Sequence, residues 1–165
     1  MENPCKPLLL VDVDGVISLF GFTSSARPDG TWLIVDGSPH LISAAAAGHL
    51  QALAVDFELA WCTGWEEKAN EYLPGALGLP GELPVVSFDS SPGGTRSGHA
   101  HWKLAAIEAY AGPGRALAWV DDALNDACHA WARERAGPTL LVETLPERGL
   151  ADEHVALLAR WARGL

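Results

Sequence analysis

Short apolar runs alternate along the chain with longer segments in which apolar residues recur every three or four positions. The runs predict five strands, at residues 7–13, 57–62, 83–88, 116–120 and 139–142. The segments between them predict helices at about 42–54, 66–73, 101–111, 123–136 and 152–162. This alternation is typical of a three-layer α/β fold, with a parallel sheet covered by helices on both faces and joined by right-handed crossovers.

One segment interrupts the alternation, at about residues 18–41. It contains two short β-like runs around "RPDG", so we expect a β-hairpin inserted after the first strand, with its turn at those four residues. Proline and glycine also predict loops at 74–84 and 112–115. The insert is too short to form a separate cap domain, and we expect one domain over residues 1–165.

Composition narrows the classes of function. The 165 residues carry a formal net charge of -10, and the 11 Lys and Arg are scattered, which disfavours broad binding of nucleic acid. The cysteines, Cys5, Cys62 and Cys128, show no metal-binding spacing and are expected to be reduced thiols. No apolar segment is long enough to span a membrane, and the N-terminus does not read as a signal peptide, so we expect a cytoplasmic protein.

Carboxylates follow two of the predicted strands directly. The first strand ends in "DVDG", which supplies Asp12, Asp14 and Gly15. The second ends in "WCTGW", with Thr63 and Gly64, and the fourth in "WVDDALND", with Asp121, Asp122 and Asp126. Lys103 lies at the start of the helix before the fourth strand. Because ligands of open parallel sheets bind beyond the carboxyl ends of the strands, we expect these side chains to converge there.

These residue types suit phosphoryl transfer. Several carboxylates at one edge repel each other unless a hard cation lies among them, and oxygen ligands without Cys or His indicate Mg²⁺. One ionised Asp is a nucleophile for phosphorus, and a second carboxyl can protonate the leaving group and then activate water. A Thr hydroxyl, a Lys and the backbone at Gly15 and Gly64 can hold the phosphoryl oxygens.

The motifs resemble, in order, the four motifs of the haloacid dehalogenase superfamily, and the resemblance covers about residues 7–142. It implies a Rossmann-like sheet of order 5-4-1-2-3, without a large cap. It also implies Asp12 as nucleophile, Asp14 as acid/base, and Thr63 and Lys103 as phosphoryl ligands. Asp122 would ligate Mg²⁺ directly, together with Asp12 and the Asp14 carbonyl, and either Asp121 or Asp126 would be a further ligand, directly or through water.

The resemblance predicts a magnesium-dependent phosphomonoester hydrolase acting through an aspartyl-phosphate on a small phosphorylated substrate. The stretch 117–142 also resembles phosphatase-like domains linked to RNA repair proteins. A nucleic-acid end-processing phosphatase, for 3'- or 5'-phosphates, and a catalytically idle phosphate-binding module are therefore the alternatives. The substrate and the oligomeric state stay open.

Each motif also has a purely structural interpretation. Thr63 can cap the helix that follows it, and the acids at 121–126 can favour a helix N-terminus. His99 and His101 are expected to lie in a loop rather than to bind a metal. Phe20, Phe22 and Trp32 of the insert either shield the mouth of the site or pack the insert onto the core.

Overall fold

The computed structural model describes residues 5–88 and 99–165. Its central sheet has four parallel strands, in the spatial order β5 (Glu58–Trp61), β1 (Leu8–Val11), β6 (Leu117–Asp121) and β7 (Thr139–Glu143). All four residues of β1 are fully buried, as expected for an apolar strand with a partner on each side. The predicted α/β class with a parallel sheet is confirmed.

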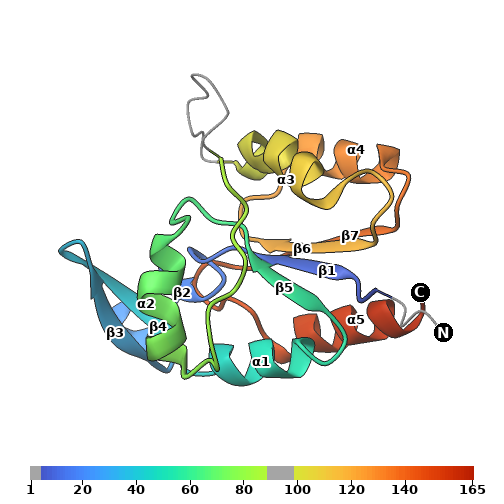
Figure 1. Cartoon of the computed structure of the whole chain (residues 1–165). Coiled ribbons are helices and arrows are strands. Elements are labelled where there is room, and N and C mark those ends of the chain that lie inside the picture. The colour runs from blue at the N-terminus through green and yellow to red at the C-terminus, as the bar shows by residue number, and fades with distance from the viewer. Residues whose placement is uncertain (1–4, 89–98) are drawn as a thin grey trace.

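Helices cover both faces of this sheet (Figure 1). Leu9 and Val11 point toward one face, where they pack with α1 (Ala46–Leu53), α2 (Lys68–Leu77) and α5 (Asp152–Arg163). Leu8 and Leu10 point toward the other, where the chain forms the short 3-10 helix η2 (Ala100–Lys103), α3 (Leu104–Ala111) and α4 (Asp126–Glu134). The period-two alternation of strand side chains thus divides the core into two layers.

The third predicted strand, 83–88, is reduced to a single parallel bridge between Val85 and Trp61. It lies next to β5, so the four strands that form follow the predicted order, but the full order 5-4-1-2-3 is not confirmed. Pro84 limits the pairing, because its carbonyl accepts from the N–H of Trp61 at 2.8 Å but it has no N–H of its own to donate to the sheet. The side chain of Asn70 bonds both the N–H and the C=O of Leu83, at 3.0 and 2.7 Å, and so holds the segment that precedes the bridge.

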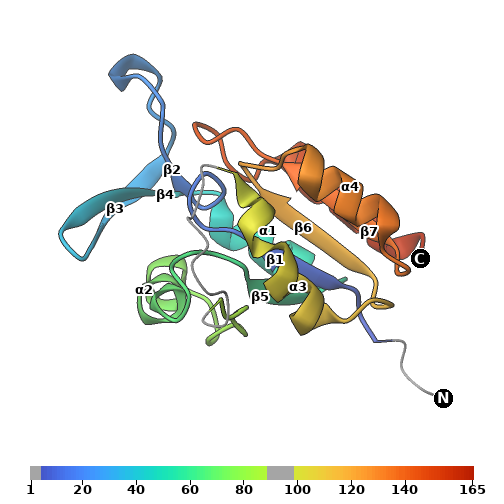
Figure 2. The same ribbon diagram turned by 90° about the horizontal axis from the view of Figure 1, so that it is seen from above.

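The insert forms a three-stranded antiparallel sheet in the order β2 (Ser18–Leu19), β4 (Ser38–Ser43), β3 (Gly30–Val35), which projects from the core (Figure 2). The hairpin is confirmed, but the predicted turn at "RPDG" is wrong. The strands turn at Asp36 and Gly37, whose φ angles of 49° and 81° suit a tight two-residue hairpin turn. Residues 27–29 belong instead to a loop with a short 3-10 helix, η1 (Ser24–Ala26).

Two helix boundaries differ most from the prediction. The helix expected from residue 42 begins at Ala46, because Ile42 and Ser43 belong to β4. The helix expected to end at Leu73 continues through Pro74 to Leu77, whose side chain packs in the core. All three cysteines are free thiols, as predicted. Within the described ranges, no helix has the length and hydropathy needed to cross a bilayer.

Candidate active site

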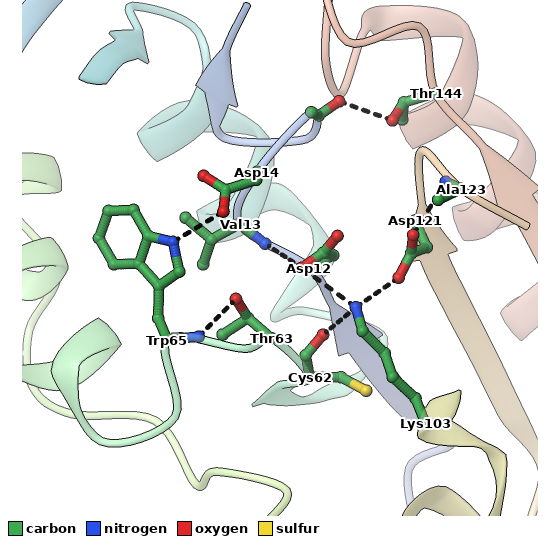
Figure 3. A network of polar contacts seen from close by, with 11 residues as sticks. Asp12, Val13, Asp14, Cys62, Thr63, Trp65, Lys103, Asp121, Ala123 and Thr144 are labelled. Atoms are coloured by element: carbon green, nitrogen blue, oxygen red, sulfur yellow. Dashed lines mark hydrogen bonds and ion pairs between the residues drawn. The ribbon is translucent and has the colours of Figure 1, made fainter. Parts of the chain in front are cut away.

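The carboxyl ends of β1, β5 and β6 bring most of the predicted residues to one pocket of about 360 Å³. Its lining includes Asp12, Asp14, Thr63, Gly64, Lys103, Asp121 and Asp122. The convergence follows from the topology, because β1 lies between β5 and β6 and all three run in the same direction. Figure 3 shows these side chains with their polar contacts.

Asp12 directly follows β1 and is only 7% exposed. Its Oδ1 accepts a hydrogen bond from the backbone N–H of Val13, at 2.8 Å, and lies 3.2 Å from the Nζ of Lys103. Both contacts go to the same oxygen, which fixes the orientation of the carboxylate and leaves Oδ2 as the oxygen for other chemistry.

Lys103 is a buried lysine, not a solvated surface residue. Its Nζ lies 2.6 Å from Asp121 Oδ2 and donates to the carbonyl of Cys62 at 3.0 Å, besides the contact with Asp12 (Figure 3). Burial alone would lower its pKa, but Asp12 and Asp121 outweigh burial, so its pKa is raised. Lys103 is therefore a fixed positive charge, and its three N–H donors all face protein oxygens.

Asp121 and Asp122 complete a cluster with Asp12. One oxygen from each of the three carboxylates lies within 4.8 Å of the others. Asp121 is 1% exposed, and its Oδ1 accepts from the N–H of Ala123 at 2.9 Å. Asp122 lies against Gly15, where a Cβ atom would be 2.3 Å from the Asp122 Cγ. Gly15, with φ of 80°, thus makes room for a carboxylate as well as for the turn.

The electrostatics of the cluster favour a cation. Burial raises the pKa of Asp12 well above its usual value, and this rise persists although Lys103 opposes it. Burial, followed by the charge of Asp121, raises the pKa of Asp122 to about 6. Three carboxylates thus face one ammonium group, and the all-oxygen donor set fits a hard divalent ion such as Mg²⁺.

Thr63 and Asp14 line the same pocket as this cluster. Thr63 is 1% exposed, and its Oγ1 accepts from the backbone N–H of Trp65 at 3.2 Å, so its own hydroxyl proton is available to a ligand. The side chain of Asp14 is 51% exposed. Figure 3 shows it turned toward Trp65, whose indole N–H donates to Asp14 Oδ2 at 3.0 Å.

Asp126 is placed apart from the other predicted ligands. It is exposed and is the first residue of α4, and it does not belong to the cluster of Asp12, Asp121 and Asp122. Its predicted alternative role at a helix N-terminus agrees with this position. His99 lines the pocket, whereas the ring of His101 is hydrogen-bonded to Asn125, which caps α4.

Some residues at the site could not be found from the sequence. Trp102 lines the pocket beside Lys103, and His40 reaches Asp14 from the insert. Neither residue belongs to a motif whose spacing could be recognised in the sequence. Phe22 and Trp32, expected from the sequence as candidates to shield the mouth, line a different pocket together with Arg27.

Comparison with known proteins gives structural similarity only. No protein-family model matches the chain, and no curated protein matches it. Three solved structures share 15–17% identity and a TM-score of 0.48 with it. A hypothetical protein from Xanthomonas campestris is matched over 96% of this chain and 84% of its own. A 3-deoxy-D-manno-octulosonate 8-phosphate phosphatase from Moraxella catarrhalis, in complex with magnesium, phosphate and KDO, is matched over 94% and 86%. A probable YrbI family phosphatase from Pseudomonas syringae is matched over 97% and 88%.

Proposed function

We propose that this protein is a magnesium-dependent phosphomonoester hydrolase of the haloacid dehalogenase type, which forms an aspartyl-phosphate at Asp12. One observation carries the proposal. The buried Lys103 and the carboxylates of Asp12, Asp121 and Asp122 come together from three separate segments at the carboxyl edge of the sheet. A fold has little reason to bury two carboxylates around one lysine, with a third and partly exposed carboxylate beside them, unless a ligand completes their charge balance.

Asp12, Asp121 and Asp122 are the residues that would hold the metal ion, and the backbone carbonyl of Asp14 is a further candidate. Bound there, Mg²⁺ would offset the negative charge that the phosphoryl group brings to an already acidic pocket. We do not include Asp126 in this set, because it is not part of the cluster of Asp12, Asp121 and Asp122.

The covalent step begins at Asp12. Its Oδ2 attacks phosphorus, the ester P–O bond breaks, and the bonding pair leaves with the substrate oxygen, which takes a proton from the carboxyl of Asp14. In the second half, Asp14 accepts a proton from water as the water oxygen attacks phosphorus. The acyl phosphate bond then breaks, which releases inorganic phosphate and restores the Asp12 carboxylate.

Thr63 and Lys103 have different roles in this proposal. Thr63 donates its hydroxyl proton to a non-bridging phosphoryl oxygen, since its oxygen already accepts from Trp65. Lys103 holds Asp12 and Asp121 in place and attracts the phosphoryl group by charge. Its contact with Asp12, at 3.2 Å, is the longest of its three contacts and the one most readily shared with a phosphoryl oxygen.

A small phosphorylated molecule fits the pocket better than a nucleic-acid end. Among the described residues that line it, Lys103 is the only lysine or arginine, and the whole chain carries a formal charge of -10. A polyanion would therefore meet repulsion on most of its length.

Hydrolysis of an aryl phosphate tests the proposal. The wild type should be inactive in excess chelator and regain activity with Mg²⁺, and Asp12→Asn should be inactive under all conditions because an amide does not attack phosphorus. Asp122→Asn should raise the Mg²⁺ concentration for half-maximal rate by about tenfold or more, as expected for disturbed metal coordination. Asp126→Asn is the matched control and should leave the Mg²⁺ concentration for half-maximal rate unchanged. Activity in chelator, or an active Asp12→Asn, would refute the mechanism.

A further inference from the structure

Asp14 differs from the other carboxylates of the site in how it is held. Oδ1 of Asp12 and Oδ1 of Asp121 each accept a backbone N–H close in sequence, at 2.8 and 2.9 Å. Asp14 follows in the turn after β1, and half of its side chain is exposed. A half-exposed carboxyl on a turn samples several rotamers unless another side chain restrains it. An acid/base group needs a defined position to be efficient.

Trp65 supplies such a restraint. Its indole N–H donates to Asp14 Oδ2 at 3.0 Å, while its backbone N–H donates to Thr63 Oγ1 at 3.2 Å. One residue therefore connects the acid/base carboxyl with the phosphoryl-binding hydroxyl. The next residue, Glu66, has a φ of 50°, an unfavourable left-handed conformation for a residue with a Cβ. The chain adopts this strained turn directly after Trp65, two residues beyond Gly64, which lines the pocket.

His40 fixes Trp65 from the other side. It lies on β4 of the insert, and its ring packs edge-on against the Trp65 ring, with centroids 4.8 Å apart and an interplanar angle of 70°. Its Nδ1 is 2.9 Å from Oγ of the buried Ser18 on β2 and 3.7 Å from Asp14 Oδ1. Two strands of the insert thus hold an imidazole against both Trp65 and Asp14.

We propose that Trp65 is a positioning residue for Asp14, and that His40 of the insert keeps Trp65 in place; this rests on the proposed function. Because an indole N–H only donates, Oδ2 of Asp14 serves as its acceptor in both protonation states. The proton that passes to the leaving oxygen, and later returns from water, is therefore carried by Oδ1. The insert contributes to the chemistry through His40 and the indole that it supports, not through Phe22 or Trp32.

The effect of the leaving group on the rate distinguishes a role of Trp65 in positioning Asp14 from a merely structural role. A phosphate ester with a poor leaving group, such as an alkyl phosphate, needs protonation as the P–O bond breaks, whereas p-nitrophenyl phosphate scarcely needs it. The value of kcat/KM covers the steps up to departure of the leaving group. Misplacement of the acid should therefore lower kcat/KM for the alkyl ester and much less for the nitrophenyl ester.

The decisive variant is Trp65→Phe, which keeps an aromatic ring and removes the N–H donor. We expect kcat/KM to fall by about tenfold or more for the alkyl phosphate, and less than about threefold for p-nitrophenyl phosphate. Asp14→Asn is the reference variant, and its kcat/KM for the alkyl phosphate should fall even further relative to that for p-nitrophenyl phosphate. Trp32→Phe applies the same substitution to a half-exposed Trp of the insert and should change neither value.

Equal losses on both esters, no loss, or a faster reaction in Trp65→Phe would overturn the inference. If that variant does not fold, His40→Gln is tested instead. Its kcat/KM should also fall more for the alkyl phosphate than for p-nitrophenyl phosphate, but by a smaller factor than in Trp65→Phe. If the wild type hydrolyses neither ester, or if Asp14→Asn shows no selectivity, the proposed function itself fails. The two failures are thus distinguishable.

Discussion

At the scale of single residues, Lys103 is the group on which the site depends. It is 4% exposed, and its ammonium lies within 3.2 Å of Asp12, Asp121 and the carbonyl of Cys62. The sequence could predict that Lys103 belongs to the site only from its place in the order of the motifs. It could not show that the three donors of this lysine are all engaged by protein oxygens, because that depends on the positions of three strand ends.

Replacement of Lys103 by methionine tests this role. Lys103→Met leaves two buried carboxylates without their counter-charge, and we expect the free energy of unfolding in chelator to fall by about 3–5 kcal/mol. Saturating Mg²⁺ should recover part of the loss, because a cation held by the same carboxylates offsets their repulsion. Urea denaturation with and without Mg²⁺ measures both effects.

Lys68→Met is the matched control. Lys68 pairs with Asp36 on the surface, where both side chains are more than half exposed, and such pairs contribute little to stability. Equal losses in the two variants, or a loss at Lys103 that Mg²⁺ does not reduce, would contradict the role assigned to Lys103.

At the scale of elements, the sequence predicted best the strands of the parallel sheet. β1, β5, β6 and β7 each overlap a predicted strand, because each contains an apolar run; the burial is complete in β1 and β6. The prediction failed where side chains decide the backbone pairing. The pairing next to β5 does not extend past Pro84, which has no N–H to donate, and the tight turn falls at Asp36–Gly37 rather than at the proline-containing "RPDG".

The N-terminus of α5 depends on a histidine. Ala151 precedes the helix and has no side-chain oxygen for a cap, but its own N–H donates to Nδ1 of His154 at 3.0 Å. Nδ1 accepts this bond only in the neutral imidazole. Burial lowers the pKa of His154; Arg148 and His49 lower it further, and Glu153 opposes them.

This cap predicts a pH dependence of stability. Because folding lowers the pKa of His154, its contribution is fully present above the unfolded-state pKa of about 6.5 and is lost as pH falls through the folded-state value. His154→Gln keeps an acceptor that does not titrate. Urea denaturation between pH 7.5 and 5 should show that the wild type loses more stability on acidification than this variant. Parallel pH profiles would contradict the assignment.

At the scale of the whole molecule, topology explains why the site could be predicted from separate motifs. Parallel strands end at one edge, so Asp12, Thr63 and Asp121 meet although more than 100 residues separate the first from the last. The contribution of the insert could not be predicted in this way. His40 reaches Asp14 only because β4 pairs with β2, which begins four residues after Asp14, and this register has no signature in the spacing of motifs.

The covalent intermediate at Asp12 is the central claim, and it can be trapped directly. The protein should be mixed with Mg²⁺ and an aryl phosphate, quenched in acid and reduced with borohydride, which converts an aspartyl-phosphate to homoserine. Mass spectrometry of the peptide that contains residues 7–20 should then show homoserine at position 12, dependent on Mg²⁺ and absent from Asp12→Asn. Turnover with an unmodified Asp12, or homoserine at Asp14 or Asp122 instead, would contradict the account.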